Sequence, residues 1–372
     1  MRAEPDRILA VNAGSSSLKL RVLDAKDRVV GSRDSDAPGN EADLRDELEA
    51  ILTDAGPIDA AGHRVVHGGA KFTDPTIVNP AVEDELDGLT DLAPLHNPPA
   101  VAAMRALDAL RPGLPTVACF DTAFHATMPA AASTYAVPAA WSERWPLRRY
   151  GFHGLSHSYA SRRAAELLDR PLAELRIVTA HLGAGASLCA VAGGRSVDTT
   201  MGFTPIEGLV MATRSGSIDP GLLLWVQRHG HIDANEMEQA LDRESGLLAL
   251  SGRSGDMREI ITGIEMGDKR CGLAFDTYVH RLGAGIAAMT AAMGGIDALV
   301  FTGGVGENSA QVRAAVGTTG GFLGIEVEGP ANDSGERDRV ISASKSAVAV
   351  LVLSAREDIE LAAQVRASLA AA

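Results

Sequence analysis

The sequence predicts an α/β fold, and two observations lead to that class. A short β-branched strand, a glycine-containing turn and a second strand occur at residues 8–24 and again at 176–192, which indicates an internal duplication. Segments with helical periodicity lie elsewhere in the chain. With 372 residues, of which 46% are hydrophobic and 22% charged, the chain has material for about two domains.

Charge and cysteine content exclude several classes of protein. The formal net charge of −14 argues against a general binder of nucleic acid or anionic membranes. No apolar run reaches the roughly 18 residues that a membrane span requires. The three cysteines, Cys119, Cys189 and Cys271, are scattered without a CxxC spacing. We therefore expect neither a disulfide framework nor a cysteine-based zinc site, and the cysteines favour a reducing cytoplasm.

The first hairpin begins with RILAVN at 7–12, continues through the turn AGSSS, and returns along LKLRVLD at 18–24. VVGS at 29–32 follows as a third strand. The second copy reads RIVTAHL at 176–182, GAGAS at 183–187 and LCAVAGG at 188–194. A Walker or Rossmann loop leads from a strand into a helix, whereas GAGAS joins two strands and lacks the Walker lysine. Neither loop type is predicted here.

A third glycine-rich turn differs because it leads into a helix. The strand ALVFT at 298–302 is followed by GGVGEN, and a helix comes next. Such a turn could hold an anion or flank a nucleotide, or its glycines could serve only a tight backbone turn. Both interpretations stay open on these residues.

Two further helices are predicted from their periodicity. Residues 270–293 form a helix of the core or of a subunit contact, and we expect one face to carry Leu273, Tyr278, Leu282, Ile286 and Met289. Residues 358–372 form an amphipathic closing helix with Leu361, Val365 and Leu369 at intervals of four.

Two arginines stand where a phosphate or carboxylate could be bound. Arg64 lies in GHRVVHGG at 62–69, a strand in which we expect no metal role for His63 and His67. Arg214 lies in the irregular, glycine- and proline-rich segment 198–221, without an obvious acidic partner nearby. Arg214 is interpreted either as a surface ion pair or as an anion clamp.

Histidines and one aspartate complete the candidate chemistry. For each of His96, His125, His153 and His157 a core histidine with satisfied hydrogen bonds is favoured. Asp121 follows the apolar strand VACF, so it lies at a strand's carboxyl end, where ligands bind in open α/β sheets. It could coordinate a metal or act as a general base. A nucleotide cradle, a carboxylate and cations are the parts that phosphoryl transfer requires.

These residues resemble the acetate kinase family over nearly the whole chain and in family order. The matching stretches are VNAGSSSLK (11–19), GHRVVHGG (62–69), LAPLHNPP (92–99), FDTAFHATMP (120–129), YGFHGLSH (150–157), the segment 198–221, SGDMRE (254–259), FTGGVGENS (301–309) and REDIELA (356–362). The resemblance implies two duplicated ribonuclease-H-like (actin-like ATPase) domains with a nucleotide cleft between them. It implies a domain of residues 1–125 plus 359–372 and a second domain, 126–358, with most of the nucleotide site.

The resemblance also implies the reaction and its participants. They are a reversible, direct in-line transfer between ATP and acetate that gives acetyl phosphate and ADP, Mg²⁺ with Mn²⁺ as an alternative ion, and a cytoplasmic homodimer. The resemblance assigns catalysis to Arg64, Asp121, His153 and Arg214, and metal binding to Asn12 and Glu357. It assigns the acyl pocket to Arg64, Val66, Leu95, His96, Phe152 and Pro205. It assigns nucleotide binding to Ser15, Ser17, Lys19, His181, Leu182, Gly183, Ala184, Gly185, Asp256, Met257, Arg258, Gly304, Val305, Gly306, Glu307 and Asn308.

The chain departs from the family pattern at three places. Residues 31–61 form a shorter segment than is usual, Ala184 replaces an asparagine, and REDI replaces the usual pair of glutamates, so that Asp358 is an alternative to Glu357. A propionate or butyrate kinase is the nearest alternative. A second alternative, which Ala184 keeps open, is an acetate kinase that uses another phosphoryl donor such as pyrophosphate. An actin-like assembly protein or a nucleotide sensor is the alternative from another class, and it would not need the paired arginines.

Overall fold

The computed structural model describes residues 5–14 and 17–372. The chain divides into two compact units. The first unit is Met1–Ala126, Phe152–Tyr159 and Arg356–Ala372, and the second is Thr127–Gly151 and Ala160–Ala355. The predicted division at 125/126 and 358/359 placed residues 152–159 and 356–358 in the second domain, whereas both segments belong to the first unit.

A six-stranded sheet forms the centre of the first unit, in the order β3-β2-β1-β4-β6-β5. Its three leading strands form an antiparallel meander, while β4 and β6 run parallel to β1 and the short β5 is antiparallel to β6. The strands are β1 (Ile8–Ala13), β2 (Ser17–Leu23), β3 (Val29–Asp36), β4 (Ala60–Val65), β5 (Thr76–Ile77) and β6 (Thr116–Phe120).

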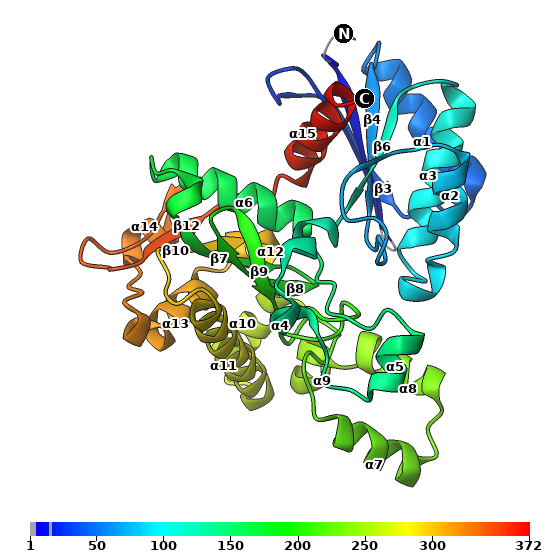
Figure 1. Cartoon of the computed structure of the whole chain (residues 1–372). Helices are drawn as coiled ribbons and strands as arrows, with labels where there is room; N and C mark the ends of the chain where they lie inside the picture. Colours follow the sequence, from blue (N-terminus) through cyan, green and yellow to red (C-terminus); the bar gives the residue numbers. More distant parts are fainter. Residues whose placement is uncertain (1–4, 15–16) are drawn as a thin grey trace. The chain divides into compact units, whose positions relative to one another are not determined.

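Helices cover both faces of this first sheet. Alternate strand residues point to opposite faces, and apolar residues on each face pack against helices. Leu9 and Val11 pack with α1 and α3, whereas Ile8 and Ala10 pack with α15 (Figure 1). The helices are α1 (Glu41–Asp54), α2 (Pro80–Asp87), α3 (Asn97–Leu110), the start of α6 (Gly154–Leu167) and α15 (Glu357–Ala370), with 3₁₀ turns at Thr90–Leu92 and Ala123–Thr127.

The second unit repeats the sheet topology of the first. Its order, β11-β12-β10-β7-β8-β9, read from the β9 end, is again an antiparallel meander, two parallel strands and an antiparallel edge. The strands are β7 (Arg176–Leu182), β8 (Ala186–Ala192), β9 (Arg195–Thr199), β10 (Ala298–Thr302), β11 (Arg339–Val340) and β12 (Ala349–Val352). The α/β fold with an internal duplication is therefore confirmed.

The long helix α11 packs against β8 and also contacts α9, α10 and α13. The helices of this unit, besides the remainder of α6, are α4 (Ala130–Ser133), α5 (Ala139–Arg144), α7 (Pro220–Gly230), α8 (Ala234–Arg243), α9 (Gly246–Ser251), α10 (Met257–Glu265), α11 (Lys269–Ala292), α12 (Gly303–Asn308), α13 (Ala310–Thr319) and α14 (Gly329–Asp333), with 3₁₀ turns at Leu172–Glu174 and Gly321–Leu323. Among the described residues, none of the helices combines the length and apolar character that a membrane span requires.

Three local predictions were wrong. Leu273 is 59% exposed, because five residues separate it from Tyr278 and turn it about 140° away from the buried face of α11. The segment GGVGEN is helix α12 and not a turn that precedes a helix. The third strand runs to Asp36, well beyond VVGS, because backbone pairing with β2 continues through polar residues.

Candidate active site

Two parallel strands of the first unit bring Arg64 and Asp121 together. Arg64 lies near the end of β4 and Asp121 directly follows β6, whose residues pair with β4 in register. The Asp121 backbone N–H donates to the carbonyl of Val65 at 2.9 Å. Arg64 Nε and Nη2 then donate to the Asp121 carboxylate at 3.0 and 2.6 Å. This two-pronged contact fixes the plane of the guanidinium.

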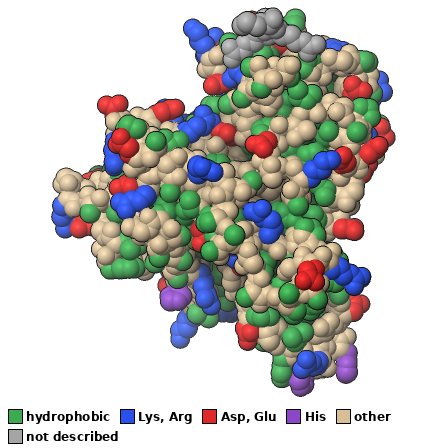
Figure 2. Space-filling view, viewed as in Figure 1, with side chains coloured by type: hydrophobic (Ala, Val, Ile, Leu, Met, Phe, Trp, Pro, Cys, Tyr) green, Lys and Arg blue, Asp and Glu red, His purple; other side chains and the backbone are tan. Residues whose placement is uncertain are grey.

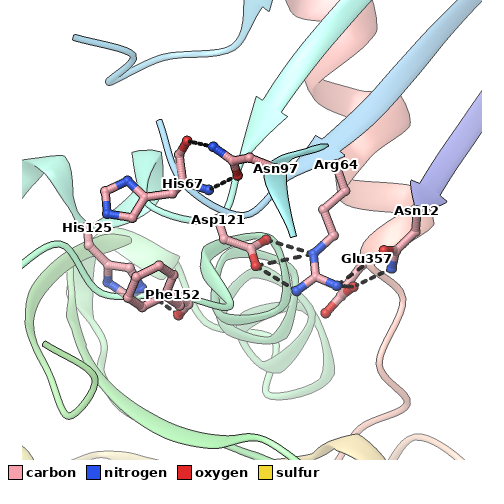
Figure 3. A network of polar contacts seen from close by, with 8 residues as sticks. All are labelled: Asn12, Arg64, His67, Asn97, Asp121, His125, Phe152 and Glu357. Carbon is pink, nitrogen blue, oxygen red and sulfur yellow. Dashed lines mark hydrogen bonds and ion pairs between the residues drawn. The ribbon is translucent and has the colours of Figure 1, made fainter. Parts of the chain in front are cut away.

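The remaining nitrogen of Arg64 faces two more candidate residues (Figure 3). Nη1 donates to Asn12 Oδ1 at 3.3 Å and lies 3.7 Å from Glu357 Oε2. Asn12 Nδ2 also donates to Glu357 Oε2 at 3.5 Å. Arg64 therefore lies between a buried carboxylate on one side and an amide–carboxylate pair on the other.

Burial and charge act in opposite directions on this network. Burial alone would lower the pKa of the Arg64 guanidinium, but Asp121 and Glu357 outweigh it and raise that pKa. For Asp121, which is 1% exposed, burial is the largest influence and raises the pKa of the carboxyl, while Arg64 opposes it. Arg64 is thus a permanent cation held in place before any substrate arrives.

The turn that carries His153 is locked to Asp121. Gly154 N–H donates to the Asp121 carbonyl at 3.0 Å, and a Cβ at Gly154 would lie 2.2 Å from that oxygen. Only glycine fits there. His153 itself has a φ of 57° and accepts the N–H of His157, so it ends the preceding extended chain and begins α6. The backbone strain at a non-glycine residue marks a candidate functional position.

Among the predicted acyl-pocket residues of the first unit, Phe152 is a buried aromatic side chain. The Phe152 carbonyl accepts a hydrogen bond from His125 Nε2 at 2.9 Å. His125 is therefore a buried histidine with a satisfied contact, as expected. Val66 is half-buried, whereas Leu95 is 39% exposed.

Asn97 is a site residue that the sequence did not reveal. Its side chain accepts from His67 N at 3.2 Å and donates to His67 O at 3.0 Å, so it holds the segment after Val66 against the segment of Leu95 and His96 (Figure 3). In the sequence, the asparagine before two prolines in LHNPP was the available signal for this role. In the structure Asn97 is fully buried, and a buried asparagine needs hydrogen-bond partners.

In the second unit, Arg214 has an acidic partner after all. Its Nε donates to Asp242 Oδ1 at 2.7 Å, and its Nη1 donates to the carbonyl of Pro205 at 3.4 Å. The sequence showed no obvious acidic partner nearby because Asp242 is 28 residues away and near the end of α8. The pair joins the irregular segment 200–219 to that helix.

The glycine turn of the second unit joins two strands of a hairpin, as predicted, but it is shorter than the predicted turn 183–187 because Ala186 and Ser187 belong to β8. His181 and Leu182 end β7, pair with Ser187 and Ala186 of β8, and leave Gly183–Gly185 as the loop. Gly183 N donates to Gly185 O at 2.9 Å, and the carbonyl of Ala184 accepts from Ala212 N at 3.1 Å. The side chain of Ala184 is exposed.

The other candidate nucleotide segments are at the starts of helices in the second unit. Asp256 caps α10 and binds the exposed Arg258 at 2.5 Å, while Met257 is buried. Gly304 of α12 has open space where a Cβ would lie. In the first unit, Lys19 is exposed and pairs with Asn12 across β1–β2, Ser17 begins β2, and Ser15 lies outside the described residues.

The Asp358 carboxylate is paired with Arg356, so Glu357 is the better candidate for a metal ligand. Arg356 binds the Asp358 carboxylate through Nε and Nη2, both at 2.9 Å. Within the part of the chain that the structure describes, no three His, Cys, Asp or Glu residues form a metal cluster. The oxygens of Asn12 and Glu357 instead fit an ion such as Mg²⁺, which binds through few protein oxygens and shares substrate phosphates.

Comparisons with known proteins agree on one family. The model of the acetokinase family matches residues 41–363. A relative named acetate kinase, from Synechococcus sp. (strain JA-2-3B'a(2-13)), is 52% identical over 313 residues, which is 84% of this chain and 77% of the relative.

Two crystal structures are similar to the chain at moderate identity. The acetate kinase of Porphyromonas gingivalis has a TM-score of 0.90 at 37% identity, covering 98% of this chain and 100% of that one. A propionate kinase from Francisella tularensis subsp. tularensis SCHU S4 has a TM-score of 0.89 at 33% identity, covering 96% and 98%.

Proposed function

The chain belongs to the acetokinase family, and on that premise we propose that it catalyses the reversible transfer of the terminal phosphoryl group of ATP to acetate. The chain is a phosphotransferase with a carboxyl group as acceptor. An acetate oxygen attacks the terminal phosphorus while the bond from that phosphorus to the bridging oxygen of ADP breaks. Acetyl phosphate and ADP result, and no proton is gained or lost at the reacting atoms.

The observation that carries the proposal is the placement of Arg64. Both reactants are anions, so a fixed cation at the point of approach offsets their repulsion. Arg64 is held by Asp121 on one side and reaches Asn12 and Glu357 on the other. An oriented guanidinium needs no reorganisation when charge develops on the transferring group.

The other catalytic residues have distinct roles. Acetate is already ionised near neutral pH, so Asp121 has no proton to remove and its role is to position Arg64. Arg214 supplies a second cation, and His153 a hydrogen-bond donor, to the equatorial oxygens of the transferring group. In a loose transition state, positioning and charge cancellation provide most of the catalysis.

We assign the discrimination between acetate and longer carboxylate acceptors to a small apolar pocket. The family resemblance assigns the acetyl methyl group to Val66, Leu95, Phe152 and Pro205, and the acetate site also to His96. A pocket that differs by one methylene discriminates by only about 1–3 kcal/mol. We therefore expect propionate to be a slower second substrate.

The nucleotide and the metal are assigned to the remaining candidates. Asn12 and Glu357 would hold Mg²⁺, or Mn²⁺ in its place, together with the phosphates. The family resemblance also assigns Ser15, Ser17 and Lys19 to the nucleotide. The ion neutralises charge on the phosphates. The segments 181–185, 256–258 and 304–308 would contact the nucleotide. The cysteines are free and buried, which supports a reducing compartment such as the cytoplasm.

A homodimer is the proposed assembly, with α7 in the contact. None of the α7 residues is buried, and Leu222, Leu224 and Trp225 are each about half exposed. Figure 2 shows hydrophobic side chains at the surface over this helix, at the lower end of the view. Light scattering should give twice the chain mass, and Trp225→Asp should lower it to that of one chain.

One assay tests the proposed reaction against its alternatives. The protein is incubated with Mg²⁺, hydroxylamine, one of acetate, propionate or butyrate, and either ATP or pyrophosphate, and acyl hydroxamate is measured. We expect the largest rate with acetate and ATP. Absence of product in that arm would falsify the proposal, and a larger rate with propionate, butyrate or pyrophosphate would favour the corresponding alternative.

A further inference from the structure

Helix α12 is too short to be stable by itself. It has six residues, three of them the glycines Gly303, Gly304 and Gly306, and an isolated helix of that length does not persist in water. Its shape must therefore come from contacts with the rest of the second unit. Two charged side chains supply those contacts, one for each end.

Arg313 holds the carboxyl end of α12. This residue lies on α13, is 2% exposed, and has the largest fully buried side chain among the described residues. Its Nη1 donates to the carbonyls of Gly306 and Glu307, both at 2.9 Å. The last carbonyls of a helix have no partner within it, so the guanidinium satisfies them.

The other face of Arg313 is fixed to α14. Nε donates to Asn332 Oδ1 and Nη2 to Asn332 O, both at 2.7 Å. Among the described residues, no carboxylate forms an ion pair with Arg313. Burial, and then the nearby Arg339, lower the pKa of Arg313 to about 10, so the side chain stays charged at neutral pH. A buried cation that is paired only with neutral oxygens is costly.

Glu307 holds the amino end of α12. Its Oε1 accepts from Gly303 N at 3.1 Å and from Ala355 N at 2.9 Å. Gly303 has a φ of 77°, and a Cβ there would lie 2.8 Å from the carbonyl of Leu182. The start of α12 therefore packs on the end of β7, next to the β7–β8 turn, so the two candidate nucleotide segments are neighbours.

The open side of α12 is where a ligand could approach. A Cβ at Gly304 would meet no heavy atom within 4 Å, in contrast to the close contacts of Gly303. Hydrogen bonds therefore fix both ends of α12, while the backbone at Gly304 stays accessible.

We propose that Arg313 is a positioning residue for nucleotide binding, which acts by fixing α12 so that residues 304–308 face the nucleotide. This inference rests on the proposed function, because that function assigns the segment to ATP. Arg313 touches no substrate itself. Its loss should weaken nucleotide binding and leave binding of the carboxylate acceptor nearly unaffected, since the hydrogen bonds found for Arg313 among the described residues go to Gly306, Glu307 and Asn332 and to none of the candidate acceptor residues.

The test compares Arg313→Met and Arg313→Lys with a matched control, Arg339→Met. Arg339 is a neighbouring arginine that donates to the carbonyls of Ala331 and Asn332 and makes no hydrogen bond to α12. For each variant, the Kd for ATP is measured by calorimetry and the KM values for ATP and acetate by the hydroxamate assay. Circular dichroism and the thermal midpoint report folding.

We expect Arg313→Met to raise the Kd and KM for ATP by about tenfold or more, because two charge-assisted hydrogen bonds to α12 are lost. The KM for acetate should change less than twofold. Arg313→Lys, which keeps the charge but loses the forked geometry, should lie between wild type and Met. Arg339→Met should leave the Kd for ATP unchanged, even where it lowers the thermal midpoint.

The inference is overturned if either folded Arg313 variant binds ATP as wild type does, or if both KM values rise together. If Arg313→Met does not fold, the Lys variant decides alone. A wild-type protein that binds ATP but forms no hydroxamate refutes the proposed function and leaves the calorimetric test of Arg313 intact.

Discussion

The two candidate catalytic arginines differ in how firmly each is held. Arg64 extends from a central strand and has a carboxylate that is 1% exposed as its partner, with Asn12 and Glu357 on its other side. Arg214 lies on a segment without regular structure, and its partner Asp242 is 19% exposed. One cation is therefore held inside the sheet of its unit by a buried carboxylate, whereas the other is held on irregular chain by a carboxylate that solvent reaches.

Arg64→Ala should have the largest effect. It removes a donor to the transferring group and leaves Asp121 as a buried, unpaired carboxylate. We expect activity to fall by about 10²–10³ or more and stability to fall by about 3–5 kcal/mol. The hydroxamate assay and urea unfolding measure the two effects. An unchanged unfolding midpoint would show that Arg64 is held no more firmly than Arg214.

Arg214→Ala should cost activity without a comparable loss of stability. Activity should again fall by about 10²–10³ because a cation is lost. Asp242, however, can be solvated once it is released, so the unfolding midpoint should move little. A stability loss as large as that of Arg64→Ala would show that the two arginines are held alike.

Asp242→Asn should have a smaller effect than Asp121→Asn. The amide can still accept one hydrogen bond from Arg214, and we expect a loss of activity of about tenfold or less. Asp121→Asn removes the charge that orients Arg64 in a buried place, so its loss should be larger. Equal losses of kcat/KM in the two variants would argue that Arg214 needs its partner as much as Arg64 does.

How much of this could be predicted from the sequence depends on the range of each interaction. Strand β7 matched its predicted bounds, because alternation and turn residues are local signals. The pairing of Arg64 with Asp121 joins residues 57 apart, and that of Arg214 with Asp242 joins residues 28 apart, so no local pattern could reveal either. Helix α12 was taken for a turn because its glycines oppose helix formation. Hydrogen bonds from the Glu307 side chain within the helix and from Arg313 on α13 overcome that preference, and a local pattern does not show them.

The smallest predicted effect concerns His63, the neighbour of Arg64 on β4. Burial lowers the pKa of His63 to about 3, and neither ring nitrogen has a hydrogen-bond partner. In the unfolded chain the pKa is about 6.5, so the unfolded state takes up the proton first as pH falls. The free energy of unfolding should therefore drop between about pH 6.5 and 3, by up to about 1.4 kcal/mol per pH unit.

His63→Leu should flatten that decline, since it removes a group that titrates only in the unfolded chain. The thermal midpoint measured from pH 7 to 5 tests this expectation. An identical slope in wild type and variant would show that His63 is protonated in the folded protein, which would place a second cation beside Arg64.

The most direct test of the account measures acetyl hydroxamate formation and ATP affinity in parallel for wild type, Arg64→Ala and Arg214→Ala. The account predicts product from wild type with acetate, ATP and Mg²⁺, and rates about 10²–10³ lower in both variants while ATP still binds. Turnover near that of wild type in either variant would contradict the claim that both arginines offset the charge of the transferring phosphoryl group.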